Sequence, residues 1–124
     1  MSARTILHVE DNELNRKIVR DLLKRTTYRL IEAHDGEAAI VTALEQNPDL
    51  ILMDIQLPKI SGIEATRRLR AESATATTPI IAITSFALSG DDQKAKDAGA
   101  SAYLAKPYSP FTLLDMIRKL LPEG

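Results

Sequence analysis

Short apolar runs alternate with longer segments of helical period along the chain, and this alternation restricts the fold more than any other feature. Two of the runs, Leu50-Ile51-Leu52-Met53 and Ile80-Ile81-Ala82-Ile83, have the length and composition of strands. Strands that alternate with helices pair in parallel, because each helix returns the chain to the same end of the sheet. The pattern therefore predicts an α/β domain.

The composition of the strands predicts their order in the sheet. Strands are expected at 5–9, 28–33, 49–53, 79–84 and 102–105, and helices at 12–25, 36–46, 62–72, 89–98 and 110–121. The first, third and fourth strands are apolar on both faces or nearly so, as strands between two helical layers must be. The second carries Arg29 and Glu32, which suits an edge. We therefore expect a doubly wound, flavodoxin-like (βα)5 fold with a five-stranded parallel sheet in the order 2-1-3-4-5.

Apolar residues in the first and last helices recur at helical spacing, which predicts one buried stripe on each. The stripes are Leu14, Ile18 and Leu22 in the first helix, and Phe111, Leu114, Ile117 and Leu121 in the last. The helix at 89–98 offers mainly Leu88, Ala95 and Ala98. With so little large apolar surface, this fourth helix is expected to dock weakly.

Length and composition limit the classes of function. The chain has 124 residues, so we expect one domain over 1–124 and no output domain. Lys and Arg number 16 against 17 Asp and Glu, which leaves no basic field for nucleic acid. The absence of Cys excludes disulfides, thiol catalysis and Cys-ligated zinc. No apolar stretch approaches membrane length and no secretory leader follows Met1, so a soluble, cytoplasmic protein is expected.

Polar side chains follow the carboxyl ends of four predicted strands. They are Glu10 and Asp11 after the first strand, Asp54 after the third, Thr84 at the end of the fourth and Lys106 after the fifth. Ligands of open α/β sheets bind outside the carboxyl ends of the strands. These side chains are therefore expected to form one site, although they lie far apart in the sequence.

The chemistry of this set points to phosphoryl transfer. Neighbouring carboxylates repel one another unless a cation is present, and Mg²⁺ prefers oxygen ligands, so Mg²⁺ is the expected cofactor. A carboxylate such as Asp54 can also act as a nucleophile and form an aspartyl phosphate. Lys106 supplies a positive charge for a phosphoryl oxygen, and Thr84 supplies a hydroxyl donor.

Each of these residues also has a purely local interpretation. The local alternatives are a helix cap for Glu10 and Asp11, a turn for Asp54, a backbone hydrogen bond for Thr84 and a solvated surface position for Lys106. The agreement of four separate strand ends favours a common site. His8 and His34 show no pattern of a nucleophile with its base, and we assign them structural or surface roles.

The residues of the predicted site resemble those of bacterial two-component response-regulator receiver domains of the CheY-like type, and the resemblance covers essentially the whole chain. The matching segments are Ile6-Leu7-His8-Val9-Glu10-Asp11-Asn12, Leu50-Ile51-Leu52-Met53-Asp54-Ile55-Gln56-Leu57-Pro58, Ile83-Thr84 and Ala105-Lys106-Pro107, with Gly62 after the second. Each segment alone is weak, but their order and spacing together are specific. The stretches around Asp11 and Asp54 are most similar to stand-alone receivers of the DivK type.

The resemblance implies a role for each residue of the site. Asp54 would accept the phosphoryl group, and Lys106 would pair with that group. Asp54, Asp11 and the backbone carbonyl of Gln56 would ligate Mg²⁺, and Glu10 would act through a bound water. The bond between Lys106 and Pro107 would be cis. Thr84 and Tyr103 would form a switch pair, in which the hydroxyl moves to a phosphoryl oxygen and the aromatic ring follows it inward.

The resemblance also implies partners. The phosphodonor would be a sensor histidine kinase or a histidine phosphotransfer protein, and the target a downstream regulator or kinase protein, with no nucleic acid or membrane. We assign Phe111 to the core. A partner-binding face near the fourth helix, fifth strand and fifth helix is expected to include Phe86, Leu88, Tyr103 and Tyr108, and phosphorylation would shift it between two packings.

Several positions and alternatives stay open. Gln56 and Phe86 occupy positions that tune hydrolysis of the aspartyl phosphate in the family, and Ser85 replaces the usual alanine or other small residue. We expect a signalling protein and not an enzyme, although it would assist its own phosphorylation and dephosphorylation. The alternatives are a small Mg²⁺-dependent phosphatase with Asp54 as nucleophile, a flavin carrier on the same fold, and an adaptor that acts without phosphorylation. Against the flavin carrier, Glu10 and Asp11 stand where a phosphate loop would be needed.

Overall fold

The computed structural model describes residues 3–85 and 90–123. Within these residues, five strands alternate with five helices. The strands are β1 Thr5–Val9, β2 Arg29–Ala33, β3 Leu50–Asp54, β4 Ile80–Thr84 and β5 Ala102–Ala105. The helices are α1 Glu13–Leu23, α2 Gly36–Gln46, α3 Gly62–Ala71, α4 Asp91–Ala98 and α5 Pro110–Leu120. The sequence-based bounds agree with these elements to within two residues at each end.

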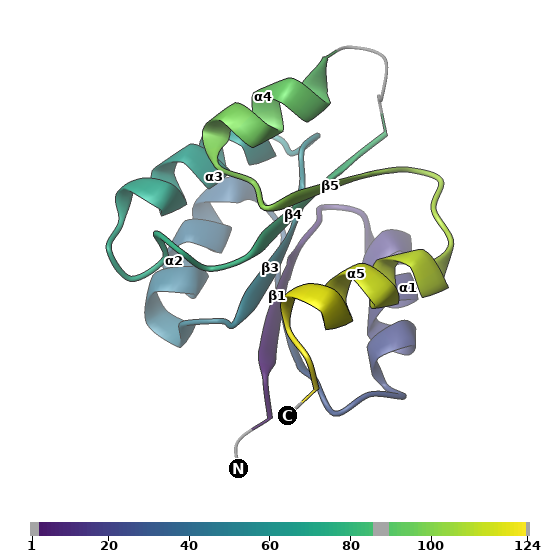
Figure 1. Ribbon diagram of the computed structural model, residues 1–124. Coiled ribbons are helices and arrows are strands. Elements are labelled where there is room, and N and C mark those ends of the chain that lie inside the picture. Colours follow the sequence, from purple (N-terminus) through teal and green to yellow (C-terminus); the bar gives the residue numbers. More distant parts are fainter. Residues whose placement is uncertain (1–2, 86–89, 124) are drawn as a thin grey trace.

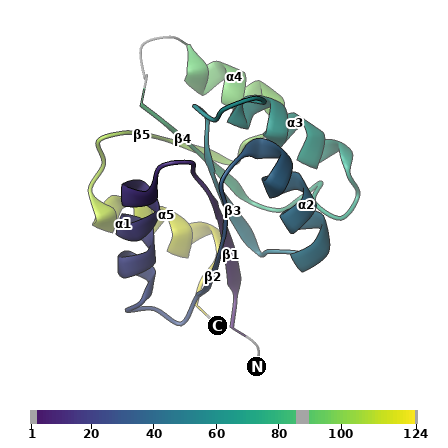
Figure 2. The same cartoon turned by 180° about the vertical axis from the view of Figure 1, so that it is seen from behind.

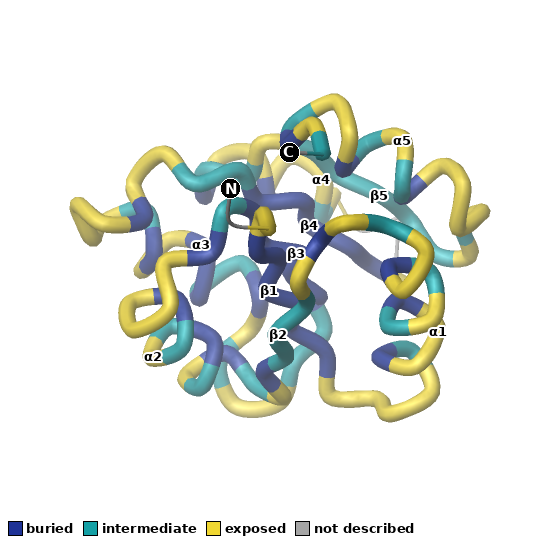
Figure 3. Tube along the Cα trace, turned by 90° about the horizontal axis from the view of Figure 1, so that it is seen from below, coloured by how far each residue is buried: buried dark blue, intermediate teal, exposed yellow. Residues whose placement is uncertain are grey.

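The strands form one parallel sheet in the order β2-β1-β3-β4-β5, which confirms the predicted fold. Helices α1 and α5 cover one face of the sheet, and α2, α3 and α4 cover the other (Figure 1, Figure 2). Every residue of β1, β3 and β4 is buried, whereas β2 and β5 at the edges are partly exposed (Figure 3). The polar residues that follow the strands therefore share one rim of a rigid sheet.

Local hydrogen bonds fix where four of the helices begin. The side chains of Asn12, Asp35, Ser61 and Ser109 each accept a hydrogen bond from a backbone N–H in the first turn of α1, α2, α3 and α5, respectively. Helix α4 differs, because Gly90 precedes it with a positive φ of 77° and no side chain caps it. The start of α4 is therefore less firmly set by its own sequence.

The core consists of two layers, one on each face of the sheet. On one face Val19 and Ile117, from α1 and α5, pack on the sheet, and on the other face α2 and α3 contribute Ala39 and Leu69. Helix α4 buries only Ala95 and Ala98, so its small apolar surface agrees with the sequence analysis. That α4 docks weakly stays a prediction.

The buried face of α1 corrects the sequence analysis. Leu14 is 65% exposed and Ile18 43% exposed, whereas Leu22 is partly buried and packs against the core as predicted. The helix fully buries Arg16, Val19 and Leu23. The guanidinium of Arg16 donates a hydrogen bond of 2.8 Å to the carbonyl of Glu10 and thereby turns this face of the helix toward the sheet. Apolar spacing alone selected the neighbouring face.

The assignment of Phe111 to the core is also wrong. Its side chain is 75% exposed, while Leu113, Ile117 and Leu121 of the same segment are buried. Position 111 lies in the first turn of α5, where the helix borders a surface groove shared with α1 that Ile18 also lines.

Among the described residues, no helix is long and apolar enough to span a membrane.

Candidate functional site

Three carboxylates meet at the carboxyl ends of β1 and β3. One ligand oxygen from each of Glu10, Asp11 and Asp54 lies within 4.8 Å of the other two. Glu10 and Asp54 are buried, whereas Asp11 is exposed. Together with Lys106, we call these residues the acidic cluster. The structure thus brings together the acidic residues that the sequence analysis grouped.

Close packing below the site fixes the position of Asp54. Its side-chain Oδ1 accepts a hydrogen bond of 3.0 Å from the backbone N–H of Gln56. The N–H of Gly62 bonds to the carbonyl of Ile55, and a Cβ at residue 62 would lie only 2.0 Å from the carbonyl oxygen of Asp54. Gly62 is therefore required for the close approach of α3 to the end of β3.

Lys106 is the cation of the cluster. Its Nζ donates a hydrogen bond of 3.0 Å to Glu10 Oε1 and lies 3.8 Å from Asp54 Oδ2. Its backbone N–H donates to the carbonyl of Thr84, which ties the end of β5 to that of β4. The bond between Lys106 and Pro107 is cis, as the resemblance implied.

The two buried carboxyl groups, those of Glu10 and Asp54, shift each other's pKa. Burial, a hydrogen bond with Glu10 and the charge of Glu10 raise the pKa of Asp54 to about 7, although Lys106 opposes the shift. Burial acts to raise the pKa of Glu10 as well, but hydrogen bonds with Asp54 and Lys106 lower it overall. The acidic cluster thus contains three carboxyl groups and one ammonium group. A divalent cation would relieve the repulsion that remains between the carboxylates.

This donor set fits Mg²⁺. All three side chains offer oxygen ligands, and the nearby buried imidazole of His8 is kept neutral, because burial lowers its pKa to about 4. His8 is packed within the sheet and His34 is exposed, in agreement with their structural and surface assignments. The carbonyl of Gln56 and the water-mediated contact of Glu10 stay predictions as parts of the metal site.

A second set of contacts lies beside the acidic cluster and involves the side chain of Gln56. Its Nε2 donates to Thr84 Oγ1 at 2.9 Å, and its Oε1 accepts from the backbone N–H of Ser85 at 2.9 Å. Asp91 Oδ2 lies 3.5 Å from both Gln56 Nε2 and Thr84 Oγ1. We call these four residues the amide clamp. The sequence analysis assigned the backbone carbonyl of Gln56 to the metal site and its position to the tuning of hydrolysis, but it predicted no contact of the side chain. It did not single out Asp91, because two adjacent acidic residues at the start of a helix do not show which of them makes a specific contact.

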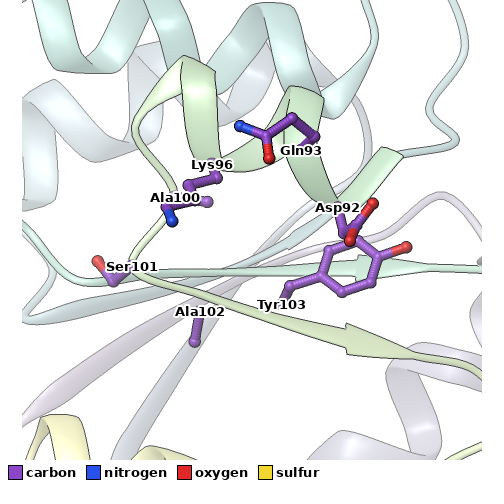
Figure 4. Close-up of a pocket in the computed structure, with 7 residues that line it drawn as sticks. All are labelled: Asp92, Gln93, Lys96, Ala100, Ser101, Ala102 and Tyr103. Carbon is purple, nitrogen blue, oxygen red and sulfur yellow. The ribbon is translucent and has the colours of Figure 1, made fainter. Parts of the chain in front are cut away.

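Tyr103 lies at the far side of the clamp. Burial raises the pKa of its hydroxyl, and an interaction with the side chain of Thr84 opposes this shift. Its ring extends from β5 toward the first turn of α4, beside Asp92 (Figure 4). Tyr103 and Asp92 line a groove of about 400 Å³ between α4 and β5. Tyr103 is thus placed between Thr84 and α4.

The other residues of the expected partner face divide into two groups. Tyr108 is half-buried, packs against the core beneath α1 and α5, and lines a separate groove with Ile18 and Lys106. Phe86 and Leu88 lie outside the described residues. The partner face itself stays a prediction.

Comparison with known proteins decides the family. A family model described as the response regulator receiver domain matches residues 6–118. The chain belongs to this family. The polar-differentiation response regulator DivK of Brucella ovis is 42% identical over 121 residues, which is 98% of each chain. The predicted resemblance to DivK-type receivers is therefore confirmed.

Solved receiver structures also have the same fold as this chain. The receiver domain of sensor histidine kinase PA1611 from Pseudomonas aeruginosa has a TM-score of 0.88 and 38% identity, over 94% of this chain and 96% of that one. Its magnesium ion is coordinated in the active site cleft of that protein. Chemotaxis response regulator CheY4 of Vibrio cholerae has a TM-score of 0.88 and 30% identity, over 95% and 98%. The receiver described here is thus a protein of two-component signalling, and not a flavin carrier on the same fold.

Proposed function

We propose that this receiver takes up a phosphoryl group on Asp54, with Mg²⁺ as cofactor, from the phosphohistidine of a sensor histidine kinase or a histidine phosphotransfer protein. The acidic cluster carries the proposal. Asp54 is buried, yet its carboxyl shares a rim with Glu10 and Asp11, and Lys106 neutralises only part of their charge. Such a cluster suits a cation and a phosphoryl group better than it suits stability alone.

The chemistry follows from the groups on the rim. A carboxylate oxygen of Asp54 attacks the phosphorus atom, the P–N bond of the donor breaks, and its electron pair remains on the imidazole nitrogen. The ammonium of Lys106 stands beside Asp54 and offsets charge on the phosphoryl oxygens. Bound Mg²⁺, held by Asp11, Asp54 and the carbonyl of Gln56, with Glu10 acting through a water, would supply further charge neutralisation.

The signal is proposed to leave through the surface of α4, β5 and α5, where a downstream regulator or kinase protein would bind. Thr84 Oγ1 lies 3.5 Å from Asp91, the first residue of α4, so a movement of this hydroxyl reaches the helix directly. Tyr103 interacts with Thr84 and lines the groove next to α4, and both observations support the proposed switch pair. We place the protein in the cytoplasm, because a phosphohistidine donor obtains its phosphoryl group from ATP.

We propose a signalling protein and not a phosphatase. The residue two positions after Asp54 is Gln56, whose carboxamide does not ionise near neutral pH and so cannot act as a general acid or base. Steady turnover of p-nitrophenyl phosphate with Mg²⁺, lost in Asp54→Asn, would contradict this part of the proposal. Equal binding of a target protein by Asp54→Asn and by the phosphorylated protein would favour the adaptor.

Intact mass spectrometry tests the acceptor. After incubation with acetyl phosphate and Mg²⁺, the mass should rise by one phosphoryl group, and EDTA should prevent the gain. Asp54→Asn should abolish it, because the nucleophile is lost. Asp115→Asn is the matched control, since Asp115 is an exposed residue of α5, and it should retain the gain. A gain that survives Asp54→Asn would overturn the assignment of the acceptor.

A further inference from the structure

The side chain of Gln56 joins two loops and a helix through a single carboxamide. Both of its ends are engaged by the same short segment, with Nε2 on the hydroxyl of Thr84 and Oε1 on the N–H of Ser85, each at 2.9 Å. The contact with Asp91 at 3.5 Å adds the first residue of α4. The clamp therefore crosses from the β3–α3 loop to the β4–α4 loop.

The groups that the clamp engages lie beside the acceptor. Asp54 pairs with Ile83 in the sheet, so Thr84 and Ser85 continue the chain along the same rim as the Asp54 carboxyl. A phosphoryl group on Asp54 has three oxygens that need donors, and the hydroxyl of Thr84 and the N–H of Ser85 are neutral donors on this rim. A backbone N–H carries one hydrogen, so Ser85 cannot serve both Gln56 and a phosphoryl oxygen at full strength.

We propose that the Gln56 side chain is a positioning residue that holds the unphosphorylated arrangement of residues 84 and 85, and that its hydrogen bond with the N–H of Ser85 must break when a phosphoryl oxygen takes that donor. The inference rests on the proposed function, since it concerns the same acceptor. It gives Gln56 a part in setting how readily the switch turns. The backbone N–H of Gln56 already bonds Asp54, so one residue couples the acceptor to the start of α4.

Linkage gives the expected size of the effect. A contact that exists only in the resting state stabilises that state relative to the state that binds a phosphoryl mimic. It therefore lowers the affinity for the mimic by the factor that corresponds to the free energy of the contact. The loss of one hydrogen bond of ordinary net strength corresponds to about a two- to twelvefold change. Gln56→Met removes both bonds and keeps a side chain of similar length, so it should raise the affinity by this factor.

The first experiment measures beryllofluoride affinity by calorimetry in the presence of Mg²⁺. Gln56→Met should bind this phosphoryl mimic about two- to twelvefold more tightly than wild type. Gln46→Met, at the exposed end of α2, should leave the affinity unchanged. Unchanged or weaker binding by Gln56→Met would overturn the proposal. If wild type gains no phosphoryl mass and binds no beryllofluoride, the proposed function fails instead.

The second experiment needs no phosphoryl chemistry, so it tests the clamp even in that case. Amide hydrogen exchange of the metal-free protein reports on the N–H of Ser85, which the clamp protects. Gln56→Met should speed exchange at Ser85 and leave exchange in β3 unchanged. Equal exchange at Ser85 in both proteins would show that the clamp is not formed and would contradict the inference.

Discussion

The acidic cluster and the amide clamp lie side by side on one rim, yet different interactions hold them together. The cluster consists of charged groups at the ends of β1, β3 and β5, and the pKa values of Glu10 and Asp54 depend on their neighbours in the cluster. The clamp consists mainly of neutral hydrogen bonds, and it leads to α4, whose buried residues are two alanines.

The proposed function assigns the chemistry to the acidic cluster and the signalling to the amide clamp. Groups that share a proton and a cation must keep their spacing, so they stand on strands with no exposed residues or beside them. A helix that is to move must be held by contacts whose loss costs little. The following predictions, from the largest expected effect to the smallest, either break this contrast or sharpen it.

Two glycines compare the packing of the two regions. Gly62→Ala places a Cβ 2.0 Å from the carbonyl oxygen of Asp54 and should lower the free energy of unfolding by about 3 kcal/mol. Gly90→Ala, before α4, meets no atom within 4 Å and suffers only from its positive φ, so it should cost about 1 kcal/mol. Urea denaturation measures both. A larger loss at position 90 would reverse the contrast.

The replacement of one polar side chain in each region compares how much charged and neutral hydrogen bonds contribute to stability. Lys106→Met leaves Glu10 and Asp54 without their cation and should cost about 2 kcal/mol at about pH 8. The cost should be smaller at about pH 5, where Asp54 holds a proton. Gln56→Met should cost about 1 kcal/mol at either pH, since its bonds involve no charge change. Equal pH dependence of the two variants would refute the contrast.

The stability of the metal-free protein should depend on pH through the acidic cluster and not through the amide clamp. The pKa of Asp54 is raised from 3.8 to about 7, so the folded state retains a proton that the unfolded chain releases. Stability should therefore fall as pH rises through this window and level off above it. The lowered pKa of Glu10 offsets part of the loss. Denaturation in EDTA should show this slope, Mg²⁺ should restore stability at about pH 8, and Asp54→Asn should abolish most of the slope.

Native-state hydrogen exchange gives the smallest and most local effect. Amides of α4, near Ala95 and Ala98, should open with a lower free energy than those of β3, because α4 buries little apolar surface. The difference should shrink in a variant that places a larger apolar side chain on the buried face, such as Ala98→Val. Equal protection of α4 and β3 in the wild type would remove the basis for an adjustable helix.

Much of the site could be predicted because backbone geometry enforces it. Parallel strands joined by helices bring their carboxyl ends to one rim, so Glu10, Asp54 and Lys106 had to meet once their strands were recognised. The clamp could not be predicted in this way. The carboxamide of Gln56 reaches Thr84 and Ser85 through a side-chain rotamer that depends on the surrounding packing, and no spacing in the sequence encodes it.

The sequence by itself determined the order of the elements, the order of the strands and the gathering of the acidic residues, because these follow from hydrophobic period and chain direction. Tertiary packing decided which face of each helix is buried. Leu14 and Phe111 lie on the surface although their spacing suggested the core, since the rotation of a helix on a sheet is set by all of its contacts together, including the bond from Arg16 to Glu10. Local patterns specify that a helix has an apolar side, and the fold selects the side that packs.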